Sequence, residues 1–207
     1  MISVQNVSKS FGGLQAVRDC SLEVGLIGPN GAGKSTLFNI IAGVFPPSSG
    51  KILLDGRDIT GKKPHELFRL GLLRTFQIAH EYGSMPVLEN LMVVPPRQSG
   101  ENLLWSCLKW GQVKREEVEV RRRAEDVVDF LRLGHVKYEL AGNLSGGQKK
   151  LLELGRTMMT DAKVVLLDEA GAGVNRTLLA ELATNIERLN KERGYTFCVI
   201  EHDMDLI

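Results

Sequence analysis

The sequence predicts an α/β fold built on a parallel sheet, with a helical part inserted in its middle. Two apolar runs, Ala162–Ala170 and Tyr195–Asp203, each end in acidic residues. Runs that are apolar throughout are typical of strands covered on both faces, as in a parallel sheet. The glycine-rich turn Gly28–Thr36 joins a third apolar run to a helical pattern. Between Pro86 and Thr160, strand signals are sparse and helical periodicity dominates, which indicates the insertion.

The first half of the chain gives the element order within this fold. "GLIGPN" ends a predicted buried strand, and "KSTLFNIIAG" continues as a helix with Leu37, Ile40 and Ile41 on one face. "GKILLDGRDI" predicts a hairpin that turns at Asp55-Gly56. We therefore expect residues 1–76 and 161–207 to form a discontinuous core.

The middle of the chain, residues 77–160, is expected to form a helical subdomain. "EEVEVRRRAEDVVDFLRL" and "KKLLELGRTMM" both have helical periodicity. The stretch "VVPPRQSG" is predicted to be a loop by its proline and glycine content.

Composition favours an ordinary soluble globular protein and excludes several classes. The chain has 207 residues, of which 43% are hydrophobic and 25% charged, with a net charge of +1. Such a charge gives no bulk attraction to nucleic acid or anionic lipid. "KREEVEVRRR" mixes both signs and is interpreted as a solvated helix face. The three cysteines have no metal-type spacing, and we find no secretion signal and no apolar run long enough to span a membrane. A membrane role is therefore expected only through a partner.

The stretch "GPNGAGKS" matches the phosphate-binding pattern G-x-x-x-x-G-K-[ST]. Its glycines let backbone N–H groups converge on phosphate oxygens, and the following helix N-terminus adds positive potential. The Lys34 ammonium is expected to reach the β- and γ-phosphates, and the Ser35 hydroxyl to bind Mg²⁺. A chance glycine turn is the alternative, but the flanking strand and helix are what the motif requires. The predicted phosphate-binding residues are Gly28, Pro29, Asn30, Gly31, Ala32, Gly33, Lys34, Ser35 and Thr36.

The run "VVLLDE" supplies a second part of a nucleotide site. It is a predicted buried strand that carries Asp168 and Glu169 at its carboxyl end. In P-loop enzymes an aspartate in this position binds Mg²⁺, usually through water. A neighbouring glutamate can polarise the attacking water as a general base. A strand that merely ends in solvated acids is the alternative, and the nearby P-loop makes it the weaker one.

Two short stretches imitate GTPase motifs. "DEAG" fits D-x-x-G, and "NKER" comes close to the guanine-reading N-K-x-D. Arg193 stands where the guanine-binding aspartate would be, and "NKER" is predicted to be a polar helix end. The GTPase interpretation is therefore weak.

A second glycine-rich turn, "LSGGQ", precedes another predicted helix. The Ser145 hydroxyl and the Gly146 and Gly147 amides would lie at a helix N-terminus, which is an anion site. An N-cap with a flexible turn is the alternative. Five specified residues downstream of a P-loop and shortly before "VVLLDE" make coincidence improbable.

Together these motifs resemble the nucleotide-binding subunits of ABC transporters, over essentially the whole chain and in the family's order. The resemblance implies a RecA-like P-loop NTPase core with an antiparallel β subdomain and an inserted helical subdomain. The resemblance implies that Gln77 in "RTFQ" contacts Mg²⁺ and the attacking water and faces the membrane subunit. It implies that His202 in "VIEHD" touches the γ-phosphate and that Phe11 in "SKSFGG" stacks on adenine. By themselves these residues have plainer interpretations: a polar loop residue, a capped strand end and a core aromatic.

Within that family, "FGGLQAV" and "DEAGAGVN" are similar to ATPases of branched-chain amino-acid importers. ATPases of lipopolysaccharide export share the first pattern. Two departures are Ala170, where the family usually has proline, and Asn175, where many members have an aspartate at the dimer interface. By the family pattern, roughly half a dozen residues are absent between Val24 and Gly25. The family's final strands and helix are absent after Ile207.

The resemblance implies an ATPase that uses ATP and Mg²⁺ and drives amino-acid import through separate permease subunits. Two ATPase subunits, identical or different, would pair head to tail. Ser145, Gly146, Gly147 and Gln148 of one would then close on the ATP held by Lys34 of the other. A periplasmic binding protein would take part indirectly, no nucleic acid would bind, and the subunit would lie at the cytoplasmic face of the membrane. The alternatives are an ATPase of another transport system such as lipopolysaccharide export, a soluble ABC ATPase that works on ribosomes or DNA, and a small-molecule P-loop kinase.

Overall fold

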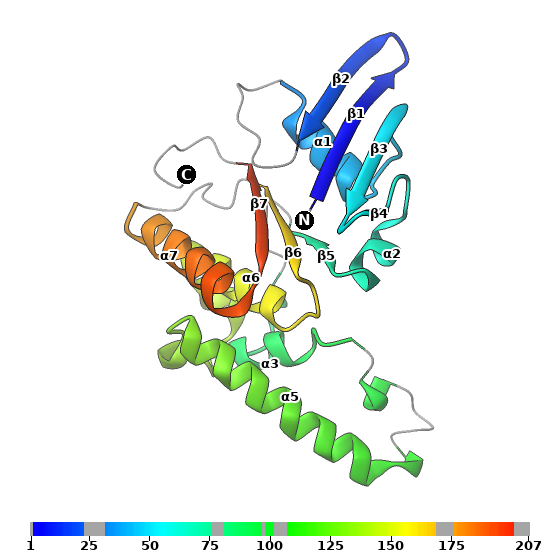
Figure 1. Ribbon diagram of the computed structural model, residues 1–207. Coiled ribbons are helices and arrows are strands. Elements are labelled where there is room, and N and C mark those ends of the chain that lie inside the picture. The colour runs from blue at the N-terminus through cyan, green and yellow to red at the C-terminus, as the bar shows by residue number, and fades with distance from the viewer. Residues whose placement is uncertain are drawn as a thin grey trace. The chain divides into compact units, whose positions relative to one another are not determined.

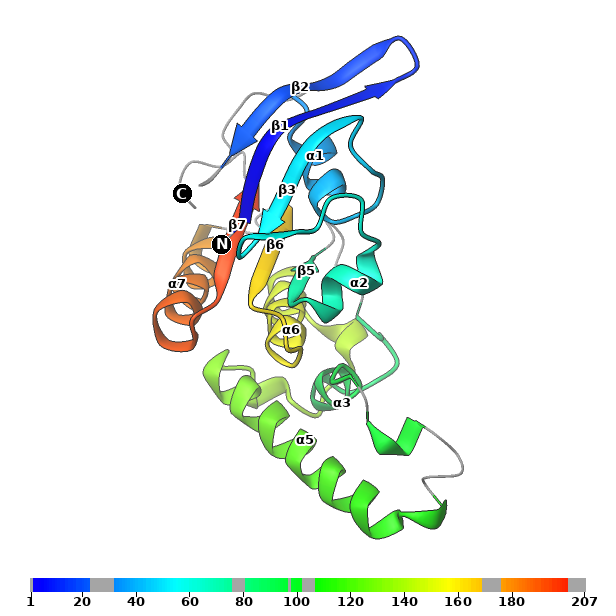
Figure 2. The same cartoon turned by 45° about the vertical axis from the view of Figure 1, so that its right-hand side comes forward.

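A computed structural model describes most of the chain, and it packs as two compact units, which are described separately (Figures 1 and 2). One unit contains Met1–Gln77 and Ala162–Ile207, and the other contains Ile78–Asp161. The described residues are 2–22, 32–75, 81–96, 98–101, 107–168 and 176–200, without the side chains of residues 168, 176 and 178.

The first unit contains a four-stranded antiparallel sheet in the order β2-β1-β3-β4. The long strands β1 (Ile2–Phe11) and β2 (Leu14–Leu22) form a hairpin, and β1 also pairs with β3 (Ser49–Leu54). The short strand β4 (Arg57–Asp58) pairs with β3 at the edge. This sheet is the antiparallel β part that the resemblance implies.

The predicted turn of the β3–β4 hairpin is confirmed. Leu54 pairs with Arg57, so Asp55 and Gly56 are the two turn residues. Both have positive φ angles, 50° and 77°. A two-residue turn of this kind matches the right-handed twist of its strands, and Asp-Gly tolerates it well.

The second sheet of this unit is parallel, with the order β5-β6-β7. Its strands are β5 (Leu72–Arg74), β6 (Val164–Asp168) and β7 (Thr196–Ile200). The two apolar runs that predicted a parallel sheet are β6 and β7, so this prediction is confirmed. Strand β5 has only three residues and no periodic signal of its own. Because the strands are parallel, their carboxyl ends lie at one edge of the sheet.

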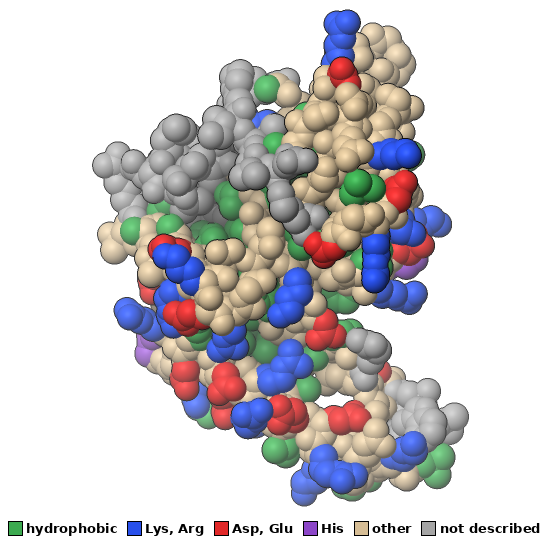
Figure 3. Space-filling model, viewed as in Figure 1, with side chains coloured by type: hydrophobic (Ala, Val, Ile, Leu, Met, Phe, Trp, Pro, Cys, Tyr) green, Lys and Arg blue, Asp and Glu red, His purple; other side chains and the backbone are tan. Residues whose placement is uncertain are grey.

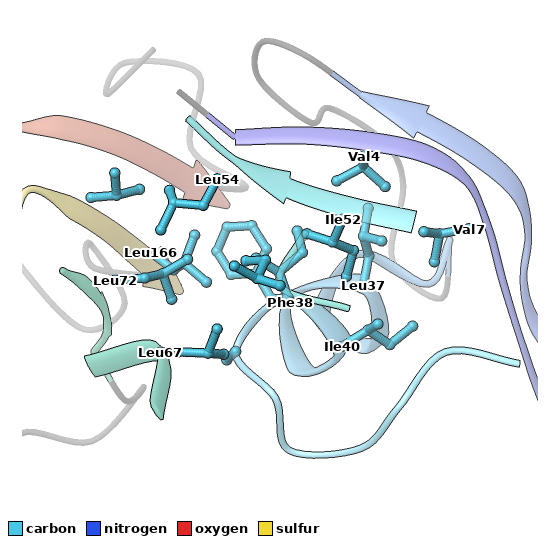
Figure 4. Packing of buried hydrophobic residues seen from close by; sticks show 14 of the residues in the cluster. Val4, Val7, Leu37, Phe38, Ile40, Ile52, Leu54, Leu67, Leu72 and Leu166 are labelled. Carbon is cyan, nitrogen blue, oxygen red and sulfur yellow. The ribbon is translucent and has the colours of Figure 1, made fainter. Parts of the chain in front are cut away.

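Three helices belong to this unit: α1 (Lys34–Ile41), α2 (Pro64–Arg69) and α7 (Arg176–Arg193). The predicted apolar face of α1 is confirmed, since Leu37, Ile40 and Ile41 are all buried. With Phe38 they form a core with residues of both sheets, among them Val4, Ile52, Leu54, Leu72 and Leu166 (Figure 4). The stretch "NKER" is the polar end of α7, as predicted.

The second unit is helical, and among its described residues only one isolated strand bridge occurs, between Pro86 and Leu140. Its elements are α3 (Val87–Met92), η1 (Ser99–Glu101), α5 (Trp110–Phe130), η2 (Gly134–Val136), η3 (Ala141–Asn143) and α6 (Gly146–Met158). The predicted helical character is confirmed.

Helix α5 carries the mixed-charge stretch that the sequence assigned to a solvated face. Its buried stripe is narrow: Val120, Ala124, Val127 and Val128. Acidic and basic side chains alternate over the rest of its surface (Figure 3). The prediction is confirmed, because most of Lys114–Arg123 is exposed.

Helix α6 packs closely against its neighbours at Gly155. A β-carbon there would lie 2.9 Å from Leu131 Cδ1, 3.1 Å from Leu91 Cδ2 and 3.1 Å from Val127 Cγ1. Leu91 belongs to α3 and Val127 to α5. A glycine at this position therefore lets three helices meet at one point. No described helix combines the length and the apolar character that crossing a bilayer would require.

Candidate nucleotide-binding site

The described part of the predicted P-loop runs from Ala32 to Thr36, and Gly28, Pro29, Asn30 and Gly31 lie outside the described residues. Gly33 is the N-cap of α1, with φ 82° and ψ 8° in the left-handed region. A β-carbon on it would lie 2.4 Å from the backbone oxygen of Ala16 in β2. Both the backbone angle and this close approach require glycine.

Lys34 is the first residue of α1, and only 6% of it is exposed. Lysine is rarely buried this deeply, and a cation at a helix N-terminus opposes the positive end of the helix dipole. A bound anion would offset both effects, because it would face the ammonium and the first N–H groups of α1 together. Ser35 is exposed and Thr36 half-buried, so the hydroxyl of Ser35 is accessible at the same helix end.

The predicted catalytic residues follow the three parallel strands. Asp168 is the last residue of β6 and pairs with Ile200 at the end of β7. The Asp168 side chain lies outside the described atoms, as do Gln77, Glu169 and His202. The strands that lead into these positions are adjacent and end at one edge of the sheet.

Two polar contacts fix β5 against its surroundings, and sequence reasoning missed both. The Arg74 guanidinium donates from Nη1 to Asn39 Oδ1 of α1. The N–H of Thr75, a buried residue, donates to the Leu166 carbonyl over 3.0 Å. Helix α1 and strand β6 are thereby both tied to the segment that ends just before Gln77.

Phe11, the predicted adenine-stacking residue, belongs to an aromatic cluster. Its ring meets that of Phe45 edge-on, with centroids 5.2 Å apart. The Lys9 ammonium lies 5.1 Å from the Phe11 centroid and donates to the Pro46 carbonyl over 2.6 Å. Phe11 is still 46% exposed, so one part of the ring is accessible. Sequence reasoning did not find Phe45 or Lys9, because neither belongs to a motif.

In the second unit, "LSGGQ" forms the start of α6 as a capping box. Ser145 is the N-cap, its Oγ accepts from the Gln148 N–H, and its own N–H donates to Gln148 Oε1 over 2.9 Å. The first N–H groups of a helix have no acceptor within it, which applies to Gly146 and Gly147. A β-carbon on Gly146 would meet open space, so that side of the turn is accessible.

Two further residues hold the first turn of α6. His135 Nε2 lies 3.4 Å from Gln148 Nε2, and Glu81 Oε1 pairs with Lys149 Nζ over 2.6 Å. Burial raises the pKa of the Glu81 carboxyl, but hydrogen bonds from Lys149 and its own backbone, with the charges of Lys149 and Arg156, outweigh burial, so the pKa is lowered. Glu81 is therefore a carboxylate that pairs with Lys149.

The donor set that the sequence predicts for a metal consists of oxygen atoms, from Ser35, Gln77 and Asp168. Hydroxyl, amide and carboxylate oxygens are ligands that suit Mg²⁺, which keeps several waters of its own. Within the ranges that the structure describes, no cluster of three or more His, Cys, Asp or Glu offers a different metal site.

Comparisons with known proteins agree with this geometry. The family model described as "ABC transporter" matches residues 21–172. A probable branched-chain amino acid transport ATP-binding protein, LivG from Archaeoglobus fulgidus, is 41% identical over 100% of this chain and 81% of its own length. A high-affinity branched-chain amino acid transport ATP-binding protein, BraF from Pseudomonas aeruginosa, is 37% identical, over 100% of this chain and 84% of its own.

The alignment to the Archaeoglobus protein spans 213 positions, against 207 residues here, so that relative carries residues within the span that this chain lacks. The junction of Val24 and Gly25, where the sequence predicts missing residues, lies outside the described residues.

Solved structures show the same fold. The ADP conformation of an ATP-binding cassette of an ABC transporter matches with a TM-score of 0.81 and 38% identity, over 100% of this chain and 82% of that one. The structure of cbiO1 from Clostridium perfringens, part of an ABC transporter complex, matches with a TM-score of 0.81 and 26% identity, over 100% of this chain and 80% of that one. With the family model covering most of the chain, these matches establish that it belongs to the ABC transporter family, as an ATP-binding cassette.

Proposed function

We propose that this cassette hydrolyses ATP to drive the import of branched-chain amino acids through separate permease subunits. The cargo class rests on relatives that are 36–41% identical and carry that transport function in their names. The segment "DEAGAGVN" supports the same branch of the family, whereas "FGGLQAV" fits both this branch and lipopolysaccharide export.

The observation that carries the ATP-binding part of the proposal is the start of α1. A glycine whose φ angle and contact with Ala16 exclude any side chain precedes a buried lysine at a helix N-terminus. This arrangement cradles phosphate oxygens with backbone N–H groups and faces them with one ammonium. Ser35, Asp168 and Gln77 would hold Mg²⁺, which supplies positive charge against the β- and γ-phosphates.

For hydrolysis, Glu169 would polarise the attacking water, and His202 would donate to the γ-phosphate as charge develops on it. Support comes from the parallel sheet, because the strands leading into Gln77, Glu169 and His202 are neighbours. Most of the rate enhancement in such a site comes from positioning and electrostatic stabilisation.

The turn "LSGGQ" (residues 144–148), which we call the signature, would complete the site of a second subunit, paired head to tail. Because the Ser145 oxygen accepts from the Gln148 N–H, its own O–H proton is available to donate to a γ-phosphate. The amides of Gly146 and Gly147 would add two further donors. In this arrangement the unit of Ile78–Asp161 acts as the helical signature subdomain, predicted as residues 77–160.

ATP binding would close the pair, and loss of the γ-phosphate would open it and reset the permease subunits. Gln77 would face the permease, and a periplasmic binding protein would deliver cargo on the other side. The cassette would therefore work at the cytoplasmic face of the membrane.

The variant Glu169→Gln tests the proposal. We expect ATP binding to persist, hydrolysis to fall by at least about a hundredfold, and a dimer to accumulate, since removing a general base costs about 10²–10⁴ in rate. Phosphate release measures the rate of hydrolysis, and size-exclusion chromatography with ATP measures dimer formation. Hydrolysis at the wild-type rate would refute the assignment of the base. Co-purification with a permease and uptake of labelled leucine, against other amino acids as controls, test the transport function.

A further inference from the structure

The first turn of α6 is tied to the segment that follows Gln77. Glu81, which is four residues after Gln77, pairs with Lys149, which is four residues after Ser145. The pair is largely buried, with 13% of the Glu81 side chain and 28% of the Lys149 side chain exposed. Partial burial shields such a pair from salt and makes it stronger than an exposed one.

Backbone contacts make this junction stiff. The N–H of Gly142 donates to the Gly83 carbonyl over 3.0 Å, and the N–H of Ala141 donates to the Met85 carbonyl over 2.9 Å. A β-carbon on Gly142 would lie 3.0 Å from the Gly83 oxygen, so a side chain at Gly142 would crowd the backbone of the other segment. The segment leading into Ser145 thus runs against the segment leading away from Glu81.

A buried amide holds the same segment from its other side. Asn90 of α3 is 0% exposed, its Oδ1 accepts from the Tyr82 N–H, and its Nδ2 donates to the carbonyls of Tyr82, Met85 and Pro86. The Arg156 guanidinium of α6 also lies over the Tyr82 ring, 5.1 Å from its centroid. The segment 81–86 is therefore bound to α3 and α6 together.

We propose that the Glu81–Lys149 pair is a positioning element that couples the two ATP sites of a dimer. This inference rests on the proposed function, in which Gln77 serves the ATP of its own subunit and Ser145 serves the ATP of the partner. A displacement that starts at Gln77 when its own ATP binds reaches Glu81 within four residues. Through Lys149 it then changes the position of Ser145 at the other ATP.

The two residues have no direct role in gripping phosphate in this proposal. Glu81 is an anion and repels phosphate, and its pairing satisfies the Lys149 ammonium. A lysine in the first helical turn opposes the helix dipole, so an acidic partner also stabilises the start of α6. Breaking the pair should therefore affect cooperation between sites and leave ATP binding to a single subunit intact.

A double-mutant cycle on the full chain tests the proposal, with Glu81→Gln, Lys149→Gln and the double variant. The ATPase rate is measured against ATP concentration, and binding of a fluorescent ATP analogue is measured at protein concentrations that keep the chain monomeric. We expect the half-saturating ATP concentration to rise about fivefold, the lower end of typical site-to-site couplings, and the Hill coefficient to fall toward one. The double variant should show no larger change in half-saturating ATP concentration or Hill coefficient than either single variant, since each single variant already removes the same contact.

Lys150→Gln is the matched control. Lys150 is the next residue of the helix and pairs with Glu153 of the same helix over 3.6 Å, so the variant removes a neighbouring lysine charge and keeps both Glu81 and Lys149. It should keep the wild-type Hill coefficient. Melting curves check folding, and if a single variant unfolds, the double variant still carries the test, because it leaves no charge unpaired.

This inference would be overturned if the double variant kept the Hill coefficient of the wild-type chain. It would also be overturned if the wild-type chain itself had a Hill coefficient of one. The inference would also be overturned if the fold-change in half-saturating ATP concentration in the double variant equalled the product of the two single fold-changes, because the two residues would then act separately. A wild-type chain that does not hydrolyse ATP would overturn the proposed function itself, so the two failures are distinguishable.

Discussion

The carbonyl oxygen of Ala16 lies 2.4 Å from the point that a β-carbon on Gly33 would occupy. The contact is with backbone, so it cannot be relieved by a side-chain rotation, and Gly33 also has φ 82°. We expect Gly33→Ala to displace the start of α1 and to weaken ATP binding by at least about tenfold, the value of one charged hydrogen bond. Titration with a fluorescent ATP analogue measures it.

Gly56→Ala is the control for this prediction. Gly56 has a nearly equal φ of 77°, but a β-carbon there meets nothing within 4 Å. It should cost about 1 kcal/mol of stability through backbone strain and leave ATP binding unchanged. Equal losses of ATP affinity in the two variants would mean that the contact with Ala16 is unimportant.

The exposed part of the Phe11 ring predicts a base-specific effect. Stacking of a base on an aromatic ring contributes about 1–3 kcal/mol, so Phe11→Ala should weaken ATP binding about 5- to 150-fold. Inorganic tripolyphosphate has no base, and its binding should not change. Competition titrations with both ligands give the ratio of affinities. A parallel loss for tripolyphosphate would show that Phe11 supports the phosphate site through Phe45 and Lys9 instead.

Ser145 offers a substitution that separates helix capping from phosphate binding. Aspartate is as good an N-cap as serine, so Ser145→Asp should keep the melting temperature near that of the wild type. Its negative charge would repel a γ-phosphate, so ATP-dependent dimer formation should be lost. Ser145→Ala is the comparison, since it removes the cap and should cost about 1 kcal/mol of stability. A Ser145→Asp chain that still dimerises with ATP would contradict the role of the signature.

Glu116 predicts a pH dependence of stability in the helical unit. Hydrogen bonds from Gln112 and from the Ser99 backbone and hydroxyl lower the pKa of its carboxyl. A lowered pKa stabilises the fold above the unfolded value of about 4.3, and that stability is lost as the pH falls through the lower folded value. The free energy of unfolding of the wild-type chain, measured with urea, should therefore decrease as the pH falls below about 4.3. Glu116→Gln should show a smaller change over the same range, and an equal change would exclude Glu116 as a contributor.

Some of the local geometry of the candidate nucleotide site could be predicted because it depends on neighbouring residues. The left-handed angle of Gly33 and the capping box of Ser145 each depend on a few consecutive residues, and a sequence motif records such a requirement directly. The turn at Asp55-Gly56 is of the same kind. Strands β6 and β7 could be predicted because both faces are covered, which leaves uninterrupted apolar runs.

The contacts that could not be predicted join residues far apart in the chain. Phe45 meets Phe11, Glu81 meets Lys149, and Ala16 lies against Gly33 only after folding. None of these pairs has a characteristic spacing. Strand β5 was also missed, because three residues are too few to show a period, and its place is set by pairing with β6.

The close packing at Gly155 fixes the rotation of α6 about its own axis. Methyl groups of Leu91, Leu131 and Val127 surround this position, so a β-carbon there would force at least one of these side chains to shift. A slip of one residue would bring Leu154 or Arg156 to that position, and neither fits. The direction in which Ser145 points is therefore set in part ten residues away, where Gly155 lets α6 pack closely against α3 and α5.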